Sequence, residues 1–381
     1  MLRRALVLMT LSLVCLALLV SCDPESEDAS APILGTGEYS NYTITRWGEL
    51  GVVDKSLVPA ELVIPETVNG IEVTGLSDSC FEGCTTLESV VIPDSVTSIS
   101  VRAFKDCSNL VSVELGKETE RIYDYAFFGC TKLESITLPE TIIYIEGDAF
   151  SDCTALTSIT IPKGVEELKE WTFYNCTSLE SVVLSEGVIK VGGFCFVGCQ
   201  ALKSLTLPTS LSEVGSNAFS RTEIEAVYIP DIYSWCSIRF KDNESGTVPC
   251  SGYRTTIYVK NPDNPDEYVS IRDIDNWELD LSASDKVPLC IPVGTFRYCR
   301  LSSIKIPATV KSIGKLAFNG SELKTIYITG GDDVCELMNT DAIPGDIEKI
   351  YVPESLVDDY KGDDDGWSSF AEKIEKLPEE V

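Results

Sequence analysis

The sequence of 381 residues contains no histidine, and its 30 lysine and arginine residues are outnumbered by 60 aspartate and glutamate residues. Without histidine the chain has no imidazole base, no histidine-activated nucleophile and no imidazole metal ligand. A formal charge of −30 argues against nucleic-acid binding, which depends on clustered basic residues. The sequence therefore predicts no catalytic residue, no metal site, no cofactor and no nucleic-acid partner.

Common enzyme motifs are also missing. The sequence has no G-x-x-x-x-G-K-[ST] loop, no G-x-G-x-x-G at a strand–helix junction and no H-E-x-x-H pair. Carboxylates occur throughout, so a chance pair could resemble the dyad of a glycosidase. A solenoid enzyme acting on polysaccharide is therefore the least favoured alternative, and the expected protein is not an enzyme.

The N-terminal residues have the pattern of an export signal. Two arginines precede an apolar run from Ala5 to Val20, which is too short to span a bilayer comfortably and is typical of a signal peptide. Leu19 to Cys22 resembles the lipobox of bacterial lipoproteins, which implies cleavage before Cys22 and lipidation of Cys22. We therefore predict a lipoprotein signal peptide over 1–21 and a flexible acidic tether over 22–37. An ordinary signal peptide is the alternative.

Phenylalanine recurs every 23 residues through the middle of the chain. This column is Phe81, Phe104, Phe127, Phe150, Phe173, Phe196 and Phe219. Three residues after each of the first six is a cysteine: Cys84, Cys107, Cys130, Cys153, Cys176 and Cys199, with Cys299 at the same position in a later unit. Leucine and serine form further columns in the same register. A fixed period of this length predicts a solenoid of stacked coils.

The strand of each coil is visible in the unit that begins at Leu87. Val90 and Ile92 alternate with Ser89 and Val91, so one set points inward and the other outward. One coil cannot bury its own apolar side, but coils stacked ~4.8 Å apart form a parallel sheet and a continuous core. We predict an α/β-type leucine-rich repeat solenoid with 23-residue coils, one parallel β-sheet and a cap at each end.

The segment from Ile92 to Leu110, with its Ala-Phe-x-x-Cys sequence, resembles the BspA-like, or Treponema-type, leucine-rich repeats. The resemblance covers about residues 40 to 230 and 291 to 331, and it implies a bacterial surface protein used in adhesion or other protein contacts. The predicted divisions are an N-terminal cap and degenerate coil (38–80), regular repeats (81–230), an irregular insertion (231–290), further repeats (291–331) and a C-terminal cap (332–381). In that cap, residues 355–360 and 367–377 have helical spacing.

The cysteines of the column are interpreted as small buried side chains, because a ladder with one thiol per coil offers no cluster of four metal ligands. Cys80 and Cys195 replace the alanine that precedes the core phenylalanine in other coils. Four cysteines lie outside the columns: Cys236, Cys250, Cys290 and Cys335. Export permits disulfides, and a Cys236–Cys250 bridge is the first hypothesis.

Two outward columns flank each core phenylalanine, one two residues before it and one immediately after it. Three coils have large apolar or aromatic side chains in both, and these form the candidate binding patch: Tyr125, Phe128, Trp171, Tyr174, Phe194 and Val197. Residues three apart would share one face of a helical turn. Exposed aromatic residues are frequent anchors in binding sites, but the alternative is that these rings pack along the edge of the coils.

The favoured function is non-catalytic recognition at the cell surface, as an adhesin or protein-binding module for protein on host or neighbouring cells. Glycan capture is the second hypothesis, because aromatic rings on a rigid face also stack on sugars. The protein is expected to be a monomer, exported and anchored through its lipid to a bacterial membrane, with the outer membrane or cell surface favoured. The ligand and the membrane leaflet are left open.

Overall fold

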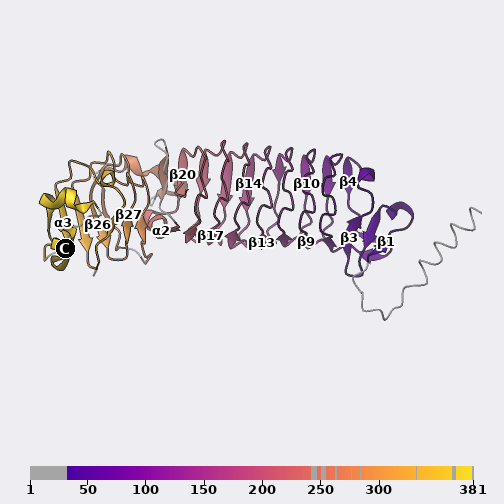
Figure 1. Ribbon diagram of the computed structural model, residues 1–381, viewed down its shortest axis with the longest axis horizontal. Helices are drawn as coiled ribbons and strands as arrows, with labels where there is room; N and C mark the ends of the chain where they lie inside the picture. The colour runs from indigo at the N-terminus through magenta and orange to yellow at the C-terminus, as the bar shows by residue number, and fades with distance from the viewer. Residues whose placement is uncertain are drawn as a thin grey trace, which may run out of the picture.

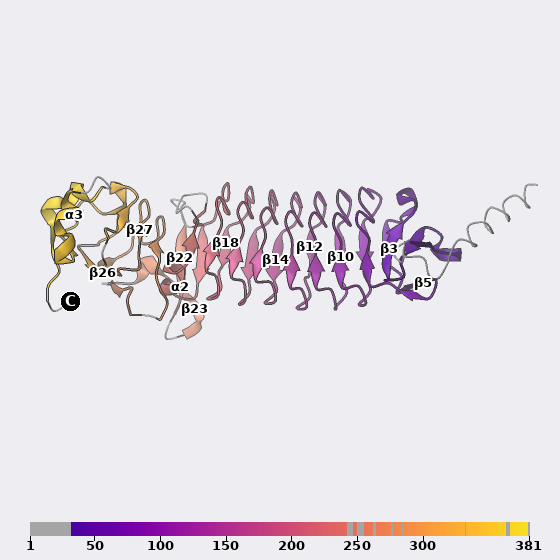
Figure 2. The same ribbon diagram turned by 60° about the horizontal axis from the view of Figure 1, so that its bottom comes forward.

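The computed structural model describes residues 32–241, 247–249, 255–261, 264–275, 277–283, 285–331, 333–362 and 366–379. These residues form an elongated rod of stacked coils with the N-terminal strands at one end and α3 (Val357–Gly362) at the other (Figures 1 and 2). The predicted signal peptide and Cys22 lie outside the described residues, as does most of the predicted tether.

Each regular coil contributes a strand that begins at the serine column. Ser89 pairs with Ser112 and Ser112 with Ser135, in parallel and 23 residues apart. The central strands on this side are β4 (Glu61–Val63), β8 (Ser89–Val91), β10 (Ser112–Glu114), β12 (Ser135–Ile136), β14 (Ser158–Ile161), β16 (Ser181–Leu184), β18 (Ser204–Thr206), β20 (Ala226–Ile229), β22 (Thr256–Asn261) and β23 (Asn264–Ser270). The prediction of a parallel β-solenoid with 23-residue coils is confirmed.

The prediction of one sheet is wrong, because every regular coil also contributes a second, two-residue strand on the opposite side (Figure 1). This sheet contains β1 (Ile33–Leu34), β2 (Tyr42–Ile44), β3 (Glu49–Val52), β7 (Gly75–Leu76), β9 (Ser98–Ile99), β11 (Arg121–Ile122), β13 (Tyr144–Ile145), β15 (Glu167–Leu168), β17 (Lys190–Val191), β19 (Glu213–Val214) and β21 (Arg239–Phe240). Its sequence signal is an apolar pair three apart, such as Val96 and Ile99, both fully buried.

The core between the two sheets contains the phenylalanine column. From Phe81 to Phe219 the rings of successive coils stack with centroids 5.1 to 5.5 Å apart and planes within 7° of parallel. Each ring is buried, so each coil gains both the transfer of an aromatic side chain out of water and the ring contact. Phe296 and Phe318 repeat the stack in the later coils at 5.3 Å.

Residues 231–290 lose the sequence period, but they continue the stack as enlarged coils. They include α2 (Ile232–Cys236), and β21 and β22 pair in parallel with β19 and β20. The Trp235 indole N–H donates to Thr295 Oγ1 at 3.0 Å, which ties α2 to the next repeats. A short 3-10 helix, Ile271–Asp273, follows the β22–β23 hairpin. The hypothetical Cys236–Cys250 bridge cannot be described, because Cys250 lies outside the described residues.

The later coils form two further parallel sheets. One contains β24 (Trp277–Asp280), β26 (Leu301–Pro307), β28 (Thr325–Thr329), β30 (Lys349–Val352) and β31 (Ile374–Lys376), and the other β25 (Cys290–Ile291), β27 (Ser312–Ile313) and β29 (Glu336–Leu337). The helical spacing predicted over 367–377 is only partly right. A 3-10 helix ends at Lys373, because buried Ile374 then pairs with Ile350 and β31 extends the sheet.

At the N-terminal end, β1, β2 and β3 pair antiparallel and β3 then joins β7 in parallel. The hairpin of β5 (Thr67–Val68) and β6 (Ile71–Glu72) lies beside them. Further 3-10 helices are Gly37–Tyr39, Lys55–Leu57, Thr340–Ala342 and Glu354–Leu356. Antiparallel pairing at this end closes the first coil, because a parallel stack would otherwise leave its strand edges unpaired.

Candidate functional site

The two outward columns lie on a tight turn whose first residue does not have a helical backbone. The residue two positions before each core phenylalanine has a left-handed backbone, with φ between 54° and 68°. This column consists of Ser79, Arg102, Tyr125, Asp148, Trp171, Phe194, Asn217, Gly294 and Leu316. The turn closes by a hydrogen bond three residues on, as from Tyr174 N–H to the Trp171 carbonyl at 3.0 Å.

A second left-handed position follows two residues after each core phenylalanine. It is occupied by Gly83, Asp106, Gly129, Asp152, Asn175, Gly198, Arg221, Tyr298 and Gly320. Glycine, asparagine and aspartate tolerate this conformation, whereas large side chains are unfavourable in it by about 1–2 kcal/mol. The second column therefore mostly obeys the backbone preference, but Tyr125, Trp171 and Phe194 in the first column oppose it. A large side chain at a position with an unfavourable backbone conformation indicates that the residue has a role other than forming the turn.

Three of the patch rings form a contact cluster on the outer edge of two adjacent coils. Trp171 and Phe194 stack with centroids 4.4 Å apart and planes 5° from parallel, and Tyr174 meets Trp171 edge-on at 5.0 Å. All three are half-buried. We call them the aromatic cluster. Val197 is only 8% exposed, so the expectation that it is an exposed contact is wrong, because the larger rings around it cover its short side chain.

The other patch rings, Tyr125 and Phe128, lie two coils away and meet edge-on at 5.8 Å. Each is approached by a cation from the preceding coil: Arg102 lies 5.7 Å from the Tyr125 centroid and Lys105 5.5 Å from that of Phe128. The intervening coil carries Asp148, whose pKa is raised by burial. The structure therefore divides the predicted patch into two parts. Among the described residues, no lysine or arginine lies over the rings of the aromatic cluster in the way that Arg102 and Lys105 lie over Tyr125 and Phe128.

A shallow hollow of about 270 Å³ adjoins the aromatic cluster. Its walls are Trp171, Tyr174, Phe194, Val197, Asn217, Ser220 and Arg221. The sequence reading placed Asn217 and Ser220 in the outward columns but missed Arg221. The signal that could have found it is its position, because Arg221 replaces the glycine, asparagine or aspartate of the second left-handed column.

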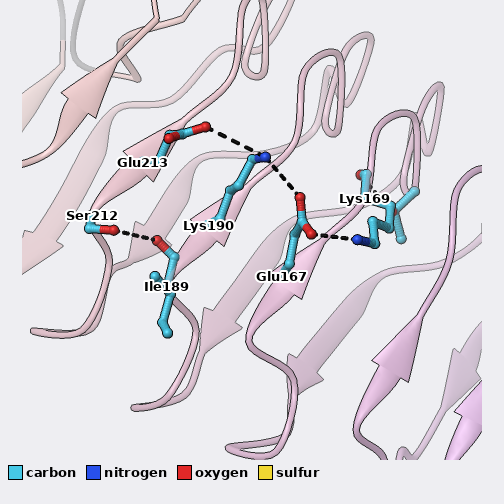
Figure 3. Close-up of polar contacts among 7 residues, drawn as sticks. Glu167, Lys169, Ile189, Lys190, Ser212 and Glu213 are labelled. Atoms are coloured by element: carbon cyan, nitrogen blue, oxygen red, sulfur yellow. Dashed lines mark hydrogen bonds and ion pairs between the residues drawn. The ribbon is translucent and has the colours of Figure 1, made fainter.

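A second hollow of about 140 Å³ is also lined by Phe194 and is bounded by an ion-pair ladder. Lys190 bonds Glu167 at 3.0 Å and Glu213 at 3.5 Å, and Glu167 also bonds Lys169 (Figure 3). Glu167, Lys190 and Glu213 come from β15, β17 and β19, and Lys169 follows β15, so the ladder joins three coils. Burial raises the pKa of Glu167, but hydrogen bonds from the two lysines dominate and lower it, so the carboxylate is ionised.

Comparison with known proteins identifies the repeats. The family model of the BspA type leucine rich repeat region matches residues 74–180, 120–245 and 290–339 in six copies, which together cover more than half of the chain. The chain belongs to the BspA-type leucine-rich repeat family. Proteins of this family are bacterial cell-surface proteins and are commonly protein-binding modules. A comparison with curated protein sequences found no match.

Solved structures of other bacterial leucine-rich repeat proteins are similar to this family member. The T. pallidum leucine-rich repeat protein is 27% identical, with a TM-score of 0.43, and the match covers 52% of this chain and 89% of the other. A leucine-rich cell surface protein of Faecalibacterium prausnitzii is 23% identical, with a TM-score of 0.48, over 85% of this chain and 90% of the other. A Bacteroides ovatus leucine-rich repeat protein is 22% identical, with a TM-score of 0.44, over 88% and 98%.

The cysteine column of this BspA-type chain lies in the core. The Cys107 thiol donates to the Phe81 carbonyl of the previous coil at 3.1 Å, and the same bond recurs from Cys130, Cys153, Cys176 and Cys199 at 3.1 to 3.2 Å. Burial raises the pKa of Cys107 to about 12, so the unreactive protonated thiol prevails near neutral pH. In the described residues, no helix is long and apolar enough to cross a membrane.

Proposed function

We propose that this chain is a non-catalytic recognition protein of the bacterial cell surface, an adhesin or protein-binding module carried on a lipid anchor at Cys22. The observation that carries the proposal is the aromatic cluster. Trp171 and Phe194 keep large rings at left-handed positions, half-exposed and in contact with each other. Rigid aromatic residues lose little conformational entropy on binding and dominate the energy of many interfaces.

The proposed mechanism is contact at several points along one edge of a stiff rod. Because successive coils are fixed by two sheets and by the phenylalanine stack, the edge residues are already ordered before the partner arrives, which lowers the entropy cost of binding. The net charge of −30 favours encounter with basic protein surfaces on host or neighbouring cells, more strongly at low salt.

The function is tested by capture from surface-protein extracts of host cells and of bacteria. The immobilised full chain is compared with Trp171→Ala and Tyr174→Ala, and with Tyr144→Ala as the control. Tyr144 is 48% exposed on β13 and lies outside the predicted patch. The expected result is a captured protein that both cluster variants lose and the control retains. Retention of every captured protein by both cluster variants would contradict the proposal.

The lipid anchor has its own test in the producing bacterium. Cys22→Ser is expected to abolish incorporation of a labelled fatty acid and to release the protein from the membrane fraction, because one or two acyl chains supply the membrane affinity. A variant that replaces Ser21 with alanine keeps the acceptor cysteine and is the control. Continued labelling of the Cys22→Ser protein would show that the anchor lies elsewhere.

Glycan binding is a second candidate, and one observation favours it. The stack of Trp171 and Phe194 is not continued in the next coil, where Asn217 occupies the same column. A ring face beside a hollow with polar walls is suited to a sugar, since sugars combine an apolar face with hydroxyl groups.

A further inference from the structure

The hollow beside Phe194 adjoins the point at which the surface stack of Trp171 and Phe194 ends. Trp171 and Phe194 occupy the same column of adjacent coils and stack at 4.4 Å. The next coil presents Asn217 in this column, and Asn217 and both rings line the hollow of about 270 Å³. Pockets for drug-sized ligands begin at about 300 Å³, so this hollow is suited to one ring-sized group.

Three of the residues that line the hollow carry hydrogen-bonding groups. Asn217 offers an amide, Ser220 a hydroxyl and Arg221 a guanidinium, which together supply several donors and two kinds of acceptor. In the part of the chain that the structure describes, these three side chains make no hydrogen bond or ion pair. Their polar atoms are therefore available to a ligand that places hydroxyl groups around a ring.

Charge excludes two other kinds of ligand. Among the described residues that line it, the hollow has one cation, Arg221, and no carboxylate, so a lysine or arginine side chain of a partner would meet a like charge there. A polyanionic chain would meet the field of a protein with net charge −30, which repels it on approach. An uncharged ring with many hydroxyl groups satisfies both conditions.

We propose that this hollow binds one pyranose ring of a neutral glycan carried on the recognised cell surface. The apolar face of the sugar stacks on Phe194, where its C–H groups meet the negative face of the aromatic ring. Its hydroxyl groups bond Asn217, Ser220 and Arg221. This inference rests on glycan binding, the second candidate function above, and it names the chemistry of one subsite in the same patch.

The second hollow that Phe194 lines gives room for a neighbouring unit of the glycan. Its lining includes glycines at which no side chain fits: a Cβ on Gly215 would lie 2.4 Å from the Gly193 nitrogen, and one on Gly192 2.6 Å from the Lys169 carbonyl carbon. The charged groups along it are Glu170 and Lys241 together with the ion-pair ladder. With three acids and three bases, this wall has no net charge to oppose a neutral chain.

The test uses the full chain and neutral tetrasaccharides of glucose, N-acetylglucosamine, mannose and galactose, with calorimetry for affinity and saturation-transfer NMR for the contacting sugar face. Asn217→Phe adds a third ring to the column of Trp171 and Phe194, at a residue that lines the hollow. The turn accommodates it, since Phe194 and Trp171 occupy this column already. Ser79→Phe adds a ring to the same column several coils away and is the matched control. Phe194→Asn removes the stacking face with a residue that tolerates the left-handed backbone.

At least one neutral tetrasaccharide is expected to bind, with its apolar-face protons most strongly saturated. Asn217→Phe and Phe194→Asn are each expected to weaken binding at least about tenfold, and Ser79→Phe to leave it unchanged. The inference is overturned if no tetrasaccharide binds, if both hollow variants bind as the native chain does, or if a glucuronate-containing tetrasaccharide binds more tightly than the neutral ones. None of these results affects the capture of protein by the native chain, so failure of this inference is distinguishable from failure of the proposed function.

Discussion

The rings of Trp171 and Phe194 lie closer together than any neighbouring pair of rings in the buried phenylalanine stack: 4.4 Å between centroids, compared with 5.1 to 5.5 Å. Both residues have a left-handed backbone, with φ of 64° and 58°. The core stack is explained by burial, but this outer pair is half-exposed and lies on unfavourable backbone. We therefore interpret this pair as a binding surface that is ordered before the ligand arrives, and not as part of the core packing.

Replacing Trp171 with asparagine tests this interpretation. The variant loses two ring contacts of about 0.5–1.5 kcal/mol each and the burial of part of the indole, about 1–2 kcal/mol. It gains relief of about 1–2 kcal/mol from the left-handed backbone. The free energy of unfolding in urea is therefore expected to fall by about 1–3 kcal/mol, while capture of the protein ligand is lost. A destabilisation above about 3 kcal/mol would instead show that Trp171 holds the coil together.

Phe150→Ala is expected to destabilise the protein by roughly 3–5 kcal/mol, because it leaves a cavity in the middle of the stack. Phe150 is fully buried between Phe127 and Phe173, with centroids 5.4 Å from each. The melting temperature reports the loss, with Tyr144→Ala as a control of similar chemistry on the exposed surface. A melting temperature of Phe150→Ala equal to that of the native chain would contradict its place in the core.

The sequence predicted the solenoid because each coil repeats a strong signal in the same register. Phenylalanine, leucine and the alternating strand around Val90 recur every 23 residues, and the parallel pairs follow that spacing. The second sheet was missed because its strands are two residues long and bury one side chain each, as in Arg121 and Ile122. Two residues cannot show alternation, so only the stacking of coils makes them a sheet.

The site was predicted in part. Comparison of equivalent positions found Trp171 and Phe194, but their spacing did not reveal that both have a left-handed backbone. The left-handed conformation could not be read from the first column, because only three of its residues, Asp148, Asn217 and Gly294, are of types that favour it. Arg221 was missed because only the positions two residues before and one residue after each core phenylalanine were compared, and Arg221 lies two residues after Phe219. Val197 was expected to be exposed, but the neighbouring rings cover it.

Lys190→Met should show how little the ion-pair ladder contributes to stability. Lys190 and Glu213 are each more than a third exposed, and exposed pairs are worth about 0.2–1 kcal/mol. The free energy of unfolding is expected to fall by no more than about 1 kcal/mol, and the difference should shrink as salt screens the charges. A larger loss that persists at 1 M salt would mean that the lysine acts through its packing.

Stability at alkaline pH depends on the buried thiols, and Cys107 offers the clearest test. Burial raises its pKa from 9.0 to about 12, so the folded chain holds this proton while the unfolded chain releases it above pH 9. The stabilisation is complete below pH 9 and is lost as the pH rises toward 12, by up to about 1.4 kcal/mol per pH unit for one thiol. Urea unfolding of the native chain and of Cys107→Ala, each from pH 7 to 11 with reductant present, separates this thiol from the other titrating groups. The native chain is expected to lose stability more steeply above pH 9 than the variant, and parallel curves would show that Cys107 ionises alike in both states.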